Sequence, residues 1–329
     1  MPKHSAQQIS SRAFWIDAPG RGRIKRQTLS GAGPGEVVVR TLYSGISRGT
    51  EALVFGGRVP ESQHRLMRAP FQQGEFSFPV QYGYASVGRI EQGPAEQLGQ
   101  TVFCLYPHQD VYTVPADRVV ALPDDVPPTR AVLAANMETA VNALWDAAPG
   151  VGDRITVIGA GVVGTLCASL AASIAGTRVR LVDSNPERTA VAGHFGLDFA
   201  MPADAPGDQD LVIHASGNPE GLRLALECAA FEARIVELSW YGEQTVGLPL
   251  GRGFHAGRLT LRSSQVGHLP PDRQARWDPA RRMRLALSLL ADPRFDALIS
   301  GETAFDALPE AYARILDPDR GELCHRVRY

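Results

Sequence analysis

Residues 154–164 read RITVIGAGVVG, and this stretch decides the fold that we expect. The apolar run at 155–158 is typical of a buried strand, and the Ala-rich run that follows the stretch is typical of a helix. Between them, Gly159, Gly161 and Gly164 form the pattern Gly-x-Gly-x-x-Gly. A strand, a glycine-rich turn and a helix in this order predict a site for the pyrophosphate of a dinucleotide.

Each glycine of the pattern meets a separate steric need. The first allows a tight turn, the second lets the backbone approach the pyrophosphate, and the third lets the helix pack closely on the strand. The N–H groups at the start of the helix, where Val162 and Val163 lie, then face the phosphates. The alternative is a glycine-rich turn in an ordinary α/β unit without a ligand.

A second strand at 178–182 ends at Asp183. A carboxylate at this place accepts hydrogen bonds from the ribose 2′-OH and repels a 2′-phosphate, so it favours NAD over NADP. Arg188 follows five residues later, where it can stack on the adenine or meet a phosphate. The alternatives are a helix N-terminal carboxylate for Asp183 and a solvated helix residue for Arg188.

The composition is typical of a soluble globular protein, and the length is enough for two domains. It has 329 residues, 44% hydrophobic and 21% charged, and a net charge of −2, which gives no reason to expect nucleic acid as a partner. The four cysteines lie far apart, so they predict neither a disulfide framework nor a structural zinc.

The N-terminal twelve residues lack the apolar core of a signal peptide, and no apolar stretch is long enough to span a bilayer. We therefore expect a cytoplasmic protein with a small-molecule substrate and no membrane partner.

The pattern of elements predicts a β-rich first part and a doubly wound second part. The first part has expected strands at 36–43, 83–90 and 101–105, a Pro-rich connection at 115–128, and a helix at 129–147. From there strands alternate with helices, which argues for a parallel sheet covered on both faces. The expected strands are 155–158, 179–182, 211–214, 234–238 and 259–262; the expected helices are 162–175, 186–195, 220–228 and 281–290; the last expected segment is 323–329.

Three short motifs resemble the medium-chain dehydrogenase/reductase superfamily. Residues 44–51 read SGISRGTE, where its zinc alcohol dehydrogenases have Gly-Ile-Cys followed by a short polar run. Residues 79–88 read PVQYGYASVG, where they have Pro, then Gly-His-Glu, then Gly; DLVIHASG at 210–217 also matches. The resemblance implies an α/β protein with a GroES-like β-rich catalytic domain at 1–135, completed by 290–329, and a Rossmann domain at 136–289. It also implies a homodimer or homotetramer, for which residues 259–266 would supply an edge strand.

The zinc ligands of that family are absent from this chain. At the matching places stand Ser47, Tyr84 with Ala85, and Ala135, and none of these side chains binds zinc well. No other set of three converging ligands can be assembled, so the resemblance implies an enzyme without a metal. The motif at 44–51 is most similar to the zinc-free branch that includes bacteriochlorophyllide 2-hydroxyethyl dehydrogenase, which suggests a secondary alcohol or ketone as substrate.

Without zinc, hydroxyl groups and an acid must polarise the substrate carbonyl and move its proton. The catalytic candidates are Tyr84, Ser47, Thr50 and Glu138. Tyr84 is the most specific because it occupies a ligand position that faces the active cleft in the family; the alternative is an aromatic pocket wall. Ser47 and Thr50 can instead cap the following turn, and Glu138 can pair with an arginine.

The resemblance also implies further cofactor contacts. In the family an arginine at the position of Arg48 often reaches the pyrophosphate, and a guanidinium suits a phosphate; the alternative is an ion pair with a carboxylate such as Glu51. Ser216 and Gly217 end a strand that lies near the cofactor. Trp240 follows the strand that ends beside the nicotinamide, and core packing is its alternative role.

These observations favour an NAD(H)-dependent oxidoreductase that works without zinc on a secondary alcohol or ketone. One alternative is an NADPH-dependent quinone or enone reductase of the same superfamily, against which Asp183 argues. A second alternative is a nucleotide-binding protein without turnover.

Overall fold

The computed structural model describes residues 8–329, so the N-terminal expectation falls mostly outside the described residues. The chain divides into two compact units. Of the described residues, the first unit contains 8–135 together with 287–291 and 299–329, and the second contains 136–286 and 292–298. The domain boundaries expected from the sequence, at 135 and 290, stay a prediction.

The second unit is built on a six-stranded parallel sheet with the order β12-β11-β10-β13-β14-β15. Its strands are β10 (Arg154–Ile158), β11 (Arg178–Val182), β12 (Asp198–Ala200), β13 (Gln209–His214), β14 (Ala229–Glu237) and β15 (Thr260–Ser263). This confirms the predicted Rossmann-like α/β fold. β12 was not predicted, because its three residues are too few to show a period.

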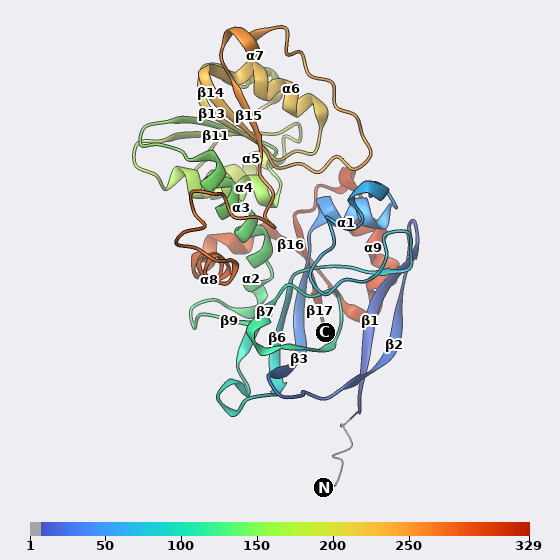
Figure 1. Cartoon of the computed structure of the whole chain (residues 1–329). Helices are drawn as coiled ribbons and strands as arrows, with labels where there is room; N and C mark the ends of the chain where they lie inside the picture. Colours follow the sequence, from blue (N-terminus) through green and yellow to red (C-terminus); the bar gives the residue numbers. More distant parts are fainter. Residues whose placement is uncertain (1–7) are drawn as a thin grey trace. The chain divides into compact units, whose positions relative to one another are not determined.

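Four helices connect strands of this sheet (Figure 1): α4 (Val162–Ala172) joins β10 to β11, α5 (Arg188–His194) joins β11 to β12, α6 (Pro219–Cys228) joins β13 to β14, and α7 (Gly253–Ala256) joins β14 to β15. The helix α3 (Ala134–Ala147) precedes β10, and α8 (Pro279–Leu289) follows β15. Connections between parallel strands are right-handed. The sheet grows in one direction from β10 to β12 and in the other from β13 to β15, so α4 and α5 cover the face opposite α6. The order of the strands therefore reverses between β10 and β13.

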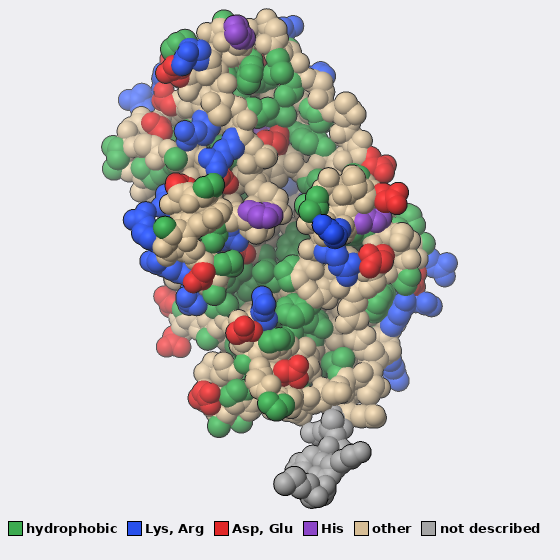
Figure 2. Space-filling view, in the orientation of Figure 1, with side chains coloured by type: hydrophobic (Ala, Val, Ile, Leu, Met, Phe, Trp, Pro, Cys, Tyr) green, Lys and Arg blue, Asp and Glu red, His purple; other side chains and the backbone are tan. Residues whose placement is uncertain are grey.

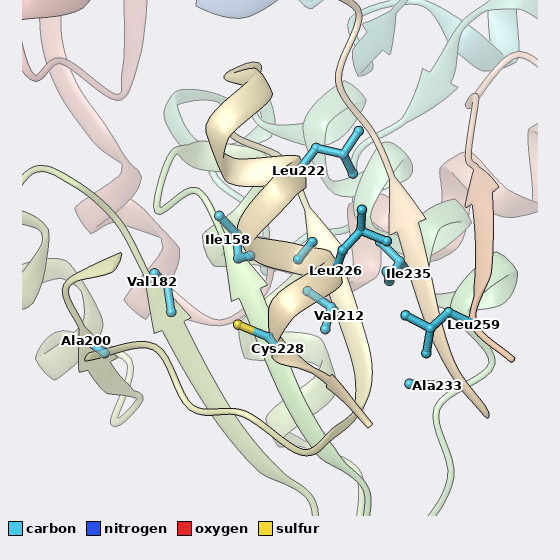
Figure 3. Close-up of a cluster of buried hydrophobic side chains, with 11 residues drawn as sticks. Ile158, Val182, Ala200, Val212, Leu222, Leu226, Cys228, Ala233, Ile235 and Leu259 are labelled. Carbon is cyan, nitrogen blue, oxygen red and sulfur yellow. The ribbon is translucent and has the colours of Figure 1, made fainter. Parts of the chain in front are cut away.

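An apolar cluster fixes α6 on the sheet (Figure 3). Leu222 and Leu226 of the helix pack over Ile158, Val212 and Ile235, which come from three neighbouring strands. These five side chains are at most 8% exposed. Burying an apolar side chain of this size contributes about 1.5–3 kcal/mol, so the cluster holds the carboxyl ends of the strands in place.

The first unit contains two sheets. A seven-stranded sheet has the order β16-β17-β3-β6-β7-β9, with β8 also pairing with β3; a smaller sheet has the order β2-β1-β5-β4. The strands are β1 (Gln8–Ala18), β2 (Arg21–Ser30), β3 (Glu36–Ile46), β4 (Gln73–Gly74), β5 (Val80–Gln81), β6 (Ser86–Gln92), β7 (Thr101–Cys104), β8 (Val111–Pro115), β9 (Val120–Ala121), β16 (Ile299–Ala304) and β17 (Cys324–Arg328). The helices α1 (Arg48–Phe55), α2 (Pro128–Ala131) and α9 (Leu308–Leu316) complete the unit.

One prediction for this part of the chain was wrong in detail, and one pair of strands was not predicted. The helix expected at 129–147 is divided into α2 and α3, with a break at Val132 and Leu133. The long hairpin of β1 and β2 was not predicted, although Pro19 and Gly20 mark its turn and Gly20 has a φ of +72°.

The surface carries both charges without a dominant sign. Acidic and basic side chains are mixed over the visible face (Figure 2). Among the described residues, no helix is long and apolar enough to cross a membrane.

Candidate active site and cofactor site

The glycine-rich turn between β10 and α4 has the geometry of a dinucleotide cradle. Gly159 has a φ of +106°, and a Cβ built on it would lie 2.7 Å from the backbone nitrogen of Ser216. A Cβ on Gly164 would lie 1.8 Å from the carbonyl oxygen of Gly159. A Cβ on Gly161, in contrast, would meet nothing within 4 Å. Packing therefore requires the outer two glycines, while the space over Gly161 is open, as the approach of a pyrophosphate requires.

This turn lies at the place where ligands of doubly wound sheets bind. The strand order reverses between β10 and β13, and in such sheets the crevice outside the carboxyl ends of the strands at the reversal holds the ligand. Gly159 follows β10, and exposed Ser216 follows β13. The turns that carry the predicted cofactor residues thus meet at the reversal.

Asp183 also belongs to this edge. It follows β11, and its carboxylate accepts hydrogen bonds from the backbone N–H of Ala160 at 2.6 Å and of Asn185 at 2.8 Å. The carboxylate is therefore fixed beside the glycine-rich turn. Arg188 begins α5; burial lowers the pKa of its guanidinium, and the negative charge of Asp183 acts in the opposite sense.

A network of hydrogen-bonded side chains supports the turn after β13. Ser216 Oγ lies 2.6 Å from His214 Nε2, and His214 Nδ1 lies 2.7 Å from Glu237 Oε2. Tyr241 donates its hydroxyl hydrogen to the same carboxylate at 2.9 Å, and Ser239 Oγ accepts from Gly217 N at 3.0 Å. Hydrogen bonding to His214 is the largest of the causes that hold the pKa of Glu237 below its ordinary value against the opposing effect of burial.

Of the residues in this support, sequence reasoning proposed a cofactor role for Ser216 and Gly217 and missed Glu237. The only sequence signal for Glu237 was its place at the end of a predicted strand. Trp240 lies half-buried in the loop that follows β14.

Three of the four catalytic candidates come together in the first unit. Ser47 directly precedes α1, Thr50 lies in its first turn, and Tyr84 lies between β5 and β6. The Ser47 and Thr50 side chains both hydrogen-bond with the Tyr84 side chain. All three are half-buried, so they are accessible in part. Burial, and after it the negative charge of Glu51, raises the pKa of Tyr84 to about 12; the two hydroxyl groups act in the opposite sense. We call these three residues the hydroxyl cluster.

Glu51 adjoins the hydroxyl cluster and was missed as a site residue. Its Oε1 accepts a hydrogen bond from the backbone N–H of Ser47 at 2.7 Å, and its Oε2 lies 2.9 Å from His108 Nε2. Tyr312 of α9 donates its hydroxyl hydrogen to Oε2 as well. Glu51 and His108 are at most 1% exposed. The two residues are 57 positions apart, so no local motif links them.

The fourth catalytic candidate, Glu138, and the predicted phosphate ligand Arg48 both have partners within the protein. The Arg48 guanidinium donates to the backbone carbonyls of Ile315, Glu322 and Asp317 around the end of α9. Glu138 is buried and pairs with Arg282 at 3.0 Å. This contact is the one expected under the alternative interpretation, in which Glu138 pairs with an arginine. Phosphate binding by Arg48 and proton transfer by Glu138 stay predictions.

The donor chemistry at the family's zinc positions does not suit zinc. A hydroxyl, a phenol and a methyl group stand at Ser47, Tyr84 and Ala135, where thiolate or imidazole would be needed. Within the described part of the chain, no group of three or more His, Cys, Asp or Glu side chains is arranged to hold a metal ion.

Sequence comparison finds dehydrogenases. The chain is 30% identical over 212 residues to 2-desacetyl-2-hydroxyethyl bacteriochlorophyllide A dehydrogenase of Rhodobacter capsulatus, a match that covers 58% of this chain and 61% of the relative. It is 26% identical over 192 residues to D-guloside 3-dehydrogenase of Escherichia coli K12, covering 54% of this chain and 55% of the relative. The chain thus matches about half to three fifths of the length of these curated relatives. No protein-family model matches.

Solved structures share the fold over the whole chain. L-idonate 5-dehydrogenase of E. coli has a TM-score of 0.80 at 16% identity, with 98% of this chain and 99% of that chain covered. An alcohol dehydrogenase of E. coli CFT073 complexed with NADH has a TM-score of 0.78 at 17% identity and covers 97% and 99%. A dehydrogenase of Sinorhizobium meliloti 1021 bound to NADP has a TM-score of 0.78 at 16% identity and covers 98% and 100%. The chain is thus similar in sequence to curated dehydrogenases and shares its fold with solved dehydrogenases, which supports the resemblance to the medium-chain, zinc-type alcohol dehydrogenase-like superfamily.

Proposed function

We propose that this protein is an oxidoreductase that moves a hydride between NAD(H) and a secondary alcohol or ketone without a metal ion. The observation that carries the proposal is the hydroxyl cluster, in which Ser47 and Tyr84 stand at positions where the superfamily has zinc ligands, in a chain that also has a complete dinucleotide cradle. The cradle belongs to the second unit and the hydroxyl cluster to the first.

The cofactor half rests on three features of the second unit. The open space over Gly161 admits a pyrophosphate, and the N–H groups at the start of α4 favour its negative charge. Asp183 is fixed at the end of β11, where its carboxylate accepts a hydrogen bond from a ribose hydroxyl. Ser216 is exposed beside the turn and held by His214. A bound nicotinamide dinucleotide supplies the hydride chemistry.

The catalytic half rests on Tyr84. As a protonated phenol it donates a hydrogen bond to the substrate oxygen, and it releases its proton as negative charge develops there. Ser47 and Thr50 hold the phenol in place through their hydroxyl groups. All three residues are partly exposed, which supports contact with a substrate oxygen. The relatives named above act on hydroxyl-bearing compounds, which supports an alcohol or ketone as the substrate class.

The test is a titration of the purified protein with NADH and with NADPH, followed by nicotinamide fluorescence. We expect NADH to bind at least about tenfold more tightly, a difference of about 1.4 kcal/mol, because Asp183 repels a 2′-phosphate. Asp183→Asn should narrow this preference. Asp198→Asn, at an exposed carboxylate on β12 that pairs with Arg180, is the matched control and should leave it unchanged.

Preference of the wild-type protein for NADPH would contradict the proposal and favour the quinone or enone reductase. Binding of NADH without turnover on any alcohol or ketone would favour the nucleotide-binding protein instead.

A further inference from the structure

A cavity of about 440 Å³ lies at the amino ends of the parallel strands in the second unit, and we call it the amino-edge cavity. Residues near the start of four neighbouring strands line it, among them Arg154, Arg178, Arg180, Asp198 and Gln209. Sites for small molecules usually have volumes of about 300–1,000 Å³, so this cavity is large enough for such a ligand.

The amino-edge cavity is separate from the dinucleotide cradle. Arg154 is the first residue of β10, whereas Gly159 directly follows the last residue of the same strand. A strand rises about 3.3 Å per residue, so the length of β10 places the two sites roughly 13 Å apart. A ligand in the amino-edge cavity therefore needs its own explanation.

The strand register brings three arginines to one face of the sheet. Arg178 and Arg180 are two residues apart on β11, and alternate side chains of a strand point to the same face. Arg154 is the register partner of Arg178 on β10. The other charged residue of the lining is Asp198, so three positive groups and one negative group give the wall a net charge of +2.

Two of the three guanidinium groups are available to a ligand. Arg180 Nη2 lies 3.4 Å from Asp198 Oδ2, and an exposed ion pair of this kind contributes little to stability. Arg178 is exposed, and within residues 8–329 its side chain has neither an ion pair nor a hydrogen bond. Like charges on neighbouring positions of one face repel each other, so an anion between Arg178 and Arg180 would be favourable.

The third guanidinium is already engaged by the protein. Arg154 pairs with Asp208 and with Asp210, which belong to the segment before β13 and to β13 itself. These two carboxylates balance the charge of Arg154 and lie beside the cavity wall. An anionic ligand would consequently be held by the two arginines of β11.

The end of α4 does not account for Arg178. The last carbonyl groups of a helix attract cations, and α4 ends beside the cavity at Ala172. However, Ser173 and Thr177 donate their hydroxyl hydrogens to carbonyl oxygens of the last turn of α4, at 3.1 and 2.8 Å. The helix end is therefore capped without the Arg178 guanidinium.

We propose that the amino-edge cavity binds a small molecule with a phosphate group, and that Arg178 and Arg180 hold this group. A phosphate monoester carries about −1.5 to −2 charges at pH 7, which complements the wall, and its three terminal oxygens match the paired N–H donors of a guanidinium. The rest of the molecule lies against Thr177, Leu197 and Pro206, which also line the cavity.

The test is a calorimetric titration of the purified protein with glycerol 3-phosphate at low ionic strength, because salt screens exposed charges. We expect binding with a Kd below about 1 mM. Arg178→Gln and Arg180→Gln each remove a charged donor and should weaken this binding at least about tenfold. Asp198→Asn removes a competing carboxylate and should tighten it by about two- to fivefold.

Two controls separate this cavity from other places that a phosphate could occupy. Arg223→Gln alters an exposed arginine of α6 that pairs with Glu220, outside the lining, and should leave the Kd unchanged. Gly161→Ala fills the open space of the cradle, so any phosphate bound there should be lost while the binding that depends on Arg178 remains.

Two results would overturn the assignment of this site. One is a wild-type protein that binds no glycerol 3-phosphate. The other is binding that Arg178→Gln and Arg180→Gln leave unchanged; if Gly161→Ala abolishes that binding, the phosphate occupies the cradle. All of these titrations are independent of turnover, so the phosphate site and the proposed function can fail separately.

Discussion

At the scale of single residues, Tyr84→Phe isolates the proton donor. The substitution removes one hydroxyl group and leaves the ring, which packs edge to face on Tyr82 with centroids 5.9 Å apart. General acid catalysis contributes about 10²–10⁴-fold, so turnover should fall by that factor while the affinity for NADH stays intact. Steady-state kinetics and nicotinamide fluorescence measure the two quantities separately.

A second tyrosine on the same unit provides the control. Tyr43→Phe on β3 alters a ring that lies under the Arg326 guanidinium, outside the hydroxyl cluster, and should retain wild-type turnover. Unchanged turnover in Tyr84→Phe on a true substrate would assign Tyr84 to the pocket wall, which was the alternative reading of this residue.

The residue scale also shows which site residues the sequence can reveal. Ser47, Thr50 and Tyr84 were found because two short motifs resemble those that carry zinc ligands in the superfamily. The motif at 44–51 also contains Glu51. Its carboxylate, however, is held by His108 and Tyr312, which lie 57 and 261 positions away. Contacts over such distances are made by the fold, and no pattern in the neighbouring sequence announces them.

At the scale of one element, the turn from β10 to α4 separates a glycine needed for folding from one needed for binding. Gly164→Ala would bring its Cβ to 1.8 Å from the Gly159 carbonyl oxygen, a backbone atom that has little freedom to move. Overpacking of this kind costs about 1–3 kcal/mol, so this variant should unfold at lower urea concentration. Gly161→Ala meets open space at a φ of −75°, so its stability should remain within about 0.5 kcal/mol of wild type.

In NADH affinity, in contrast, Gly161→Ala should be the affected variant. Because a pyrophosphate needs the space over Gly161, the Gly161→Ala protein should lose at least about tenfold in NADH affinity although it remains fully folded. Urea denaturation and NADH titration on both proteins complete the comparison. Wild-type affinity in Gly161→Ala would mean that no phosphate group approaches this turn.

Elements were predictable where the sequence had a clear period. The parallel strands β10, β11 and β13 were found within one or two residues because their apolar runs are flanked by Gly or Asp. β2 was missed since it reads RGRIKRQTLS, with few apolar residues, and it is stable because it pairs with β1 along nearly its whole length. The break between α2 and α3 has no Pro or Gly to mark it, so tertiary packing overrides a helical pattern there.

At the scale of the whole molecule, the chain closes its first unit with its last strand. β17 lies between β3 from the beginning of the chain and β16 from near its end. His325 of β17 is buried, with Nε2 at 2.7 Å from Thr303 Oγ1 and Nδ1 at 2.8 Å from Glu322 Oε2. Burial, the largest cause, lowers the pKa of His325 even though Glu322 acts in the opposite sense.

This lowered pKa makes the closure dependent on pH. The unfolded chain binds a proton at His325 near the ordinary histidine value of about 6.5, while the folded chain resists it until the pH is lower. The contribution of His325 to stability is therefore fully present above about pH 6.5 and is lost as the pH falls below that value.

Between pH 7.5 and 5.5, hydrogen exchange of the β17 amides, corrected for the intrinsic pH dependence, should show decreasing protection in the wild-type protein. His325→Gln removes the titrating group and should make that decrease smaller, whereas His194→Gln, at an exposed histidine of α5, should retain it. An equal decrease in wild type and His325→Gln would assign the pH dependence of β17 to groups other than His325.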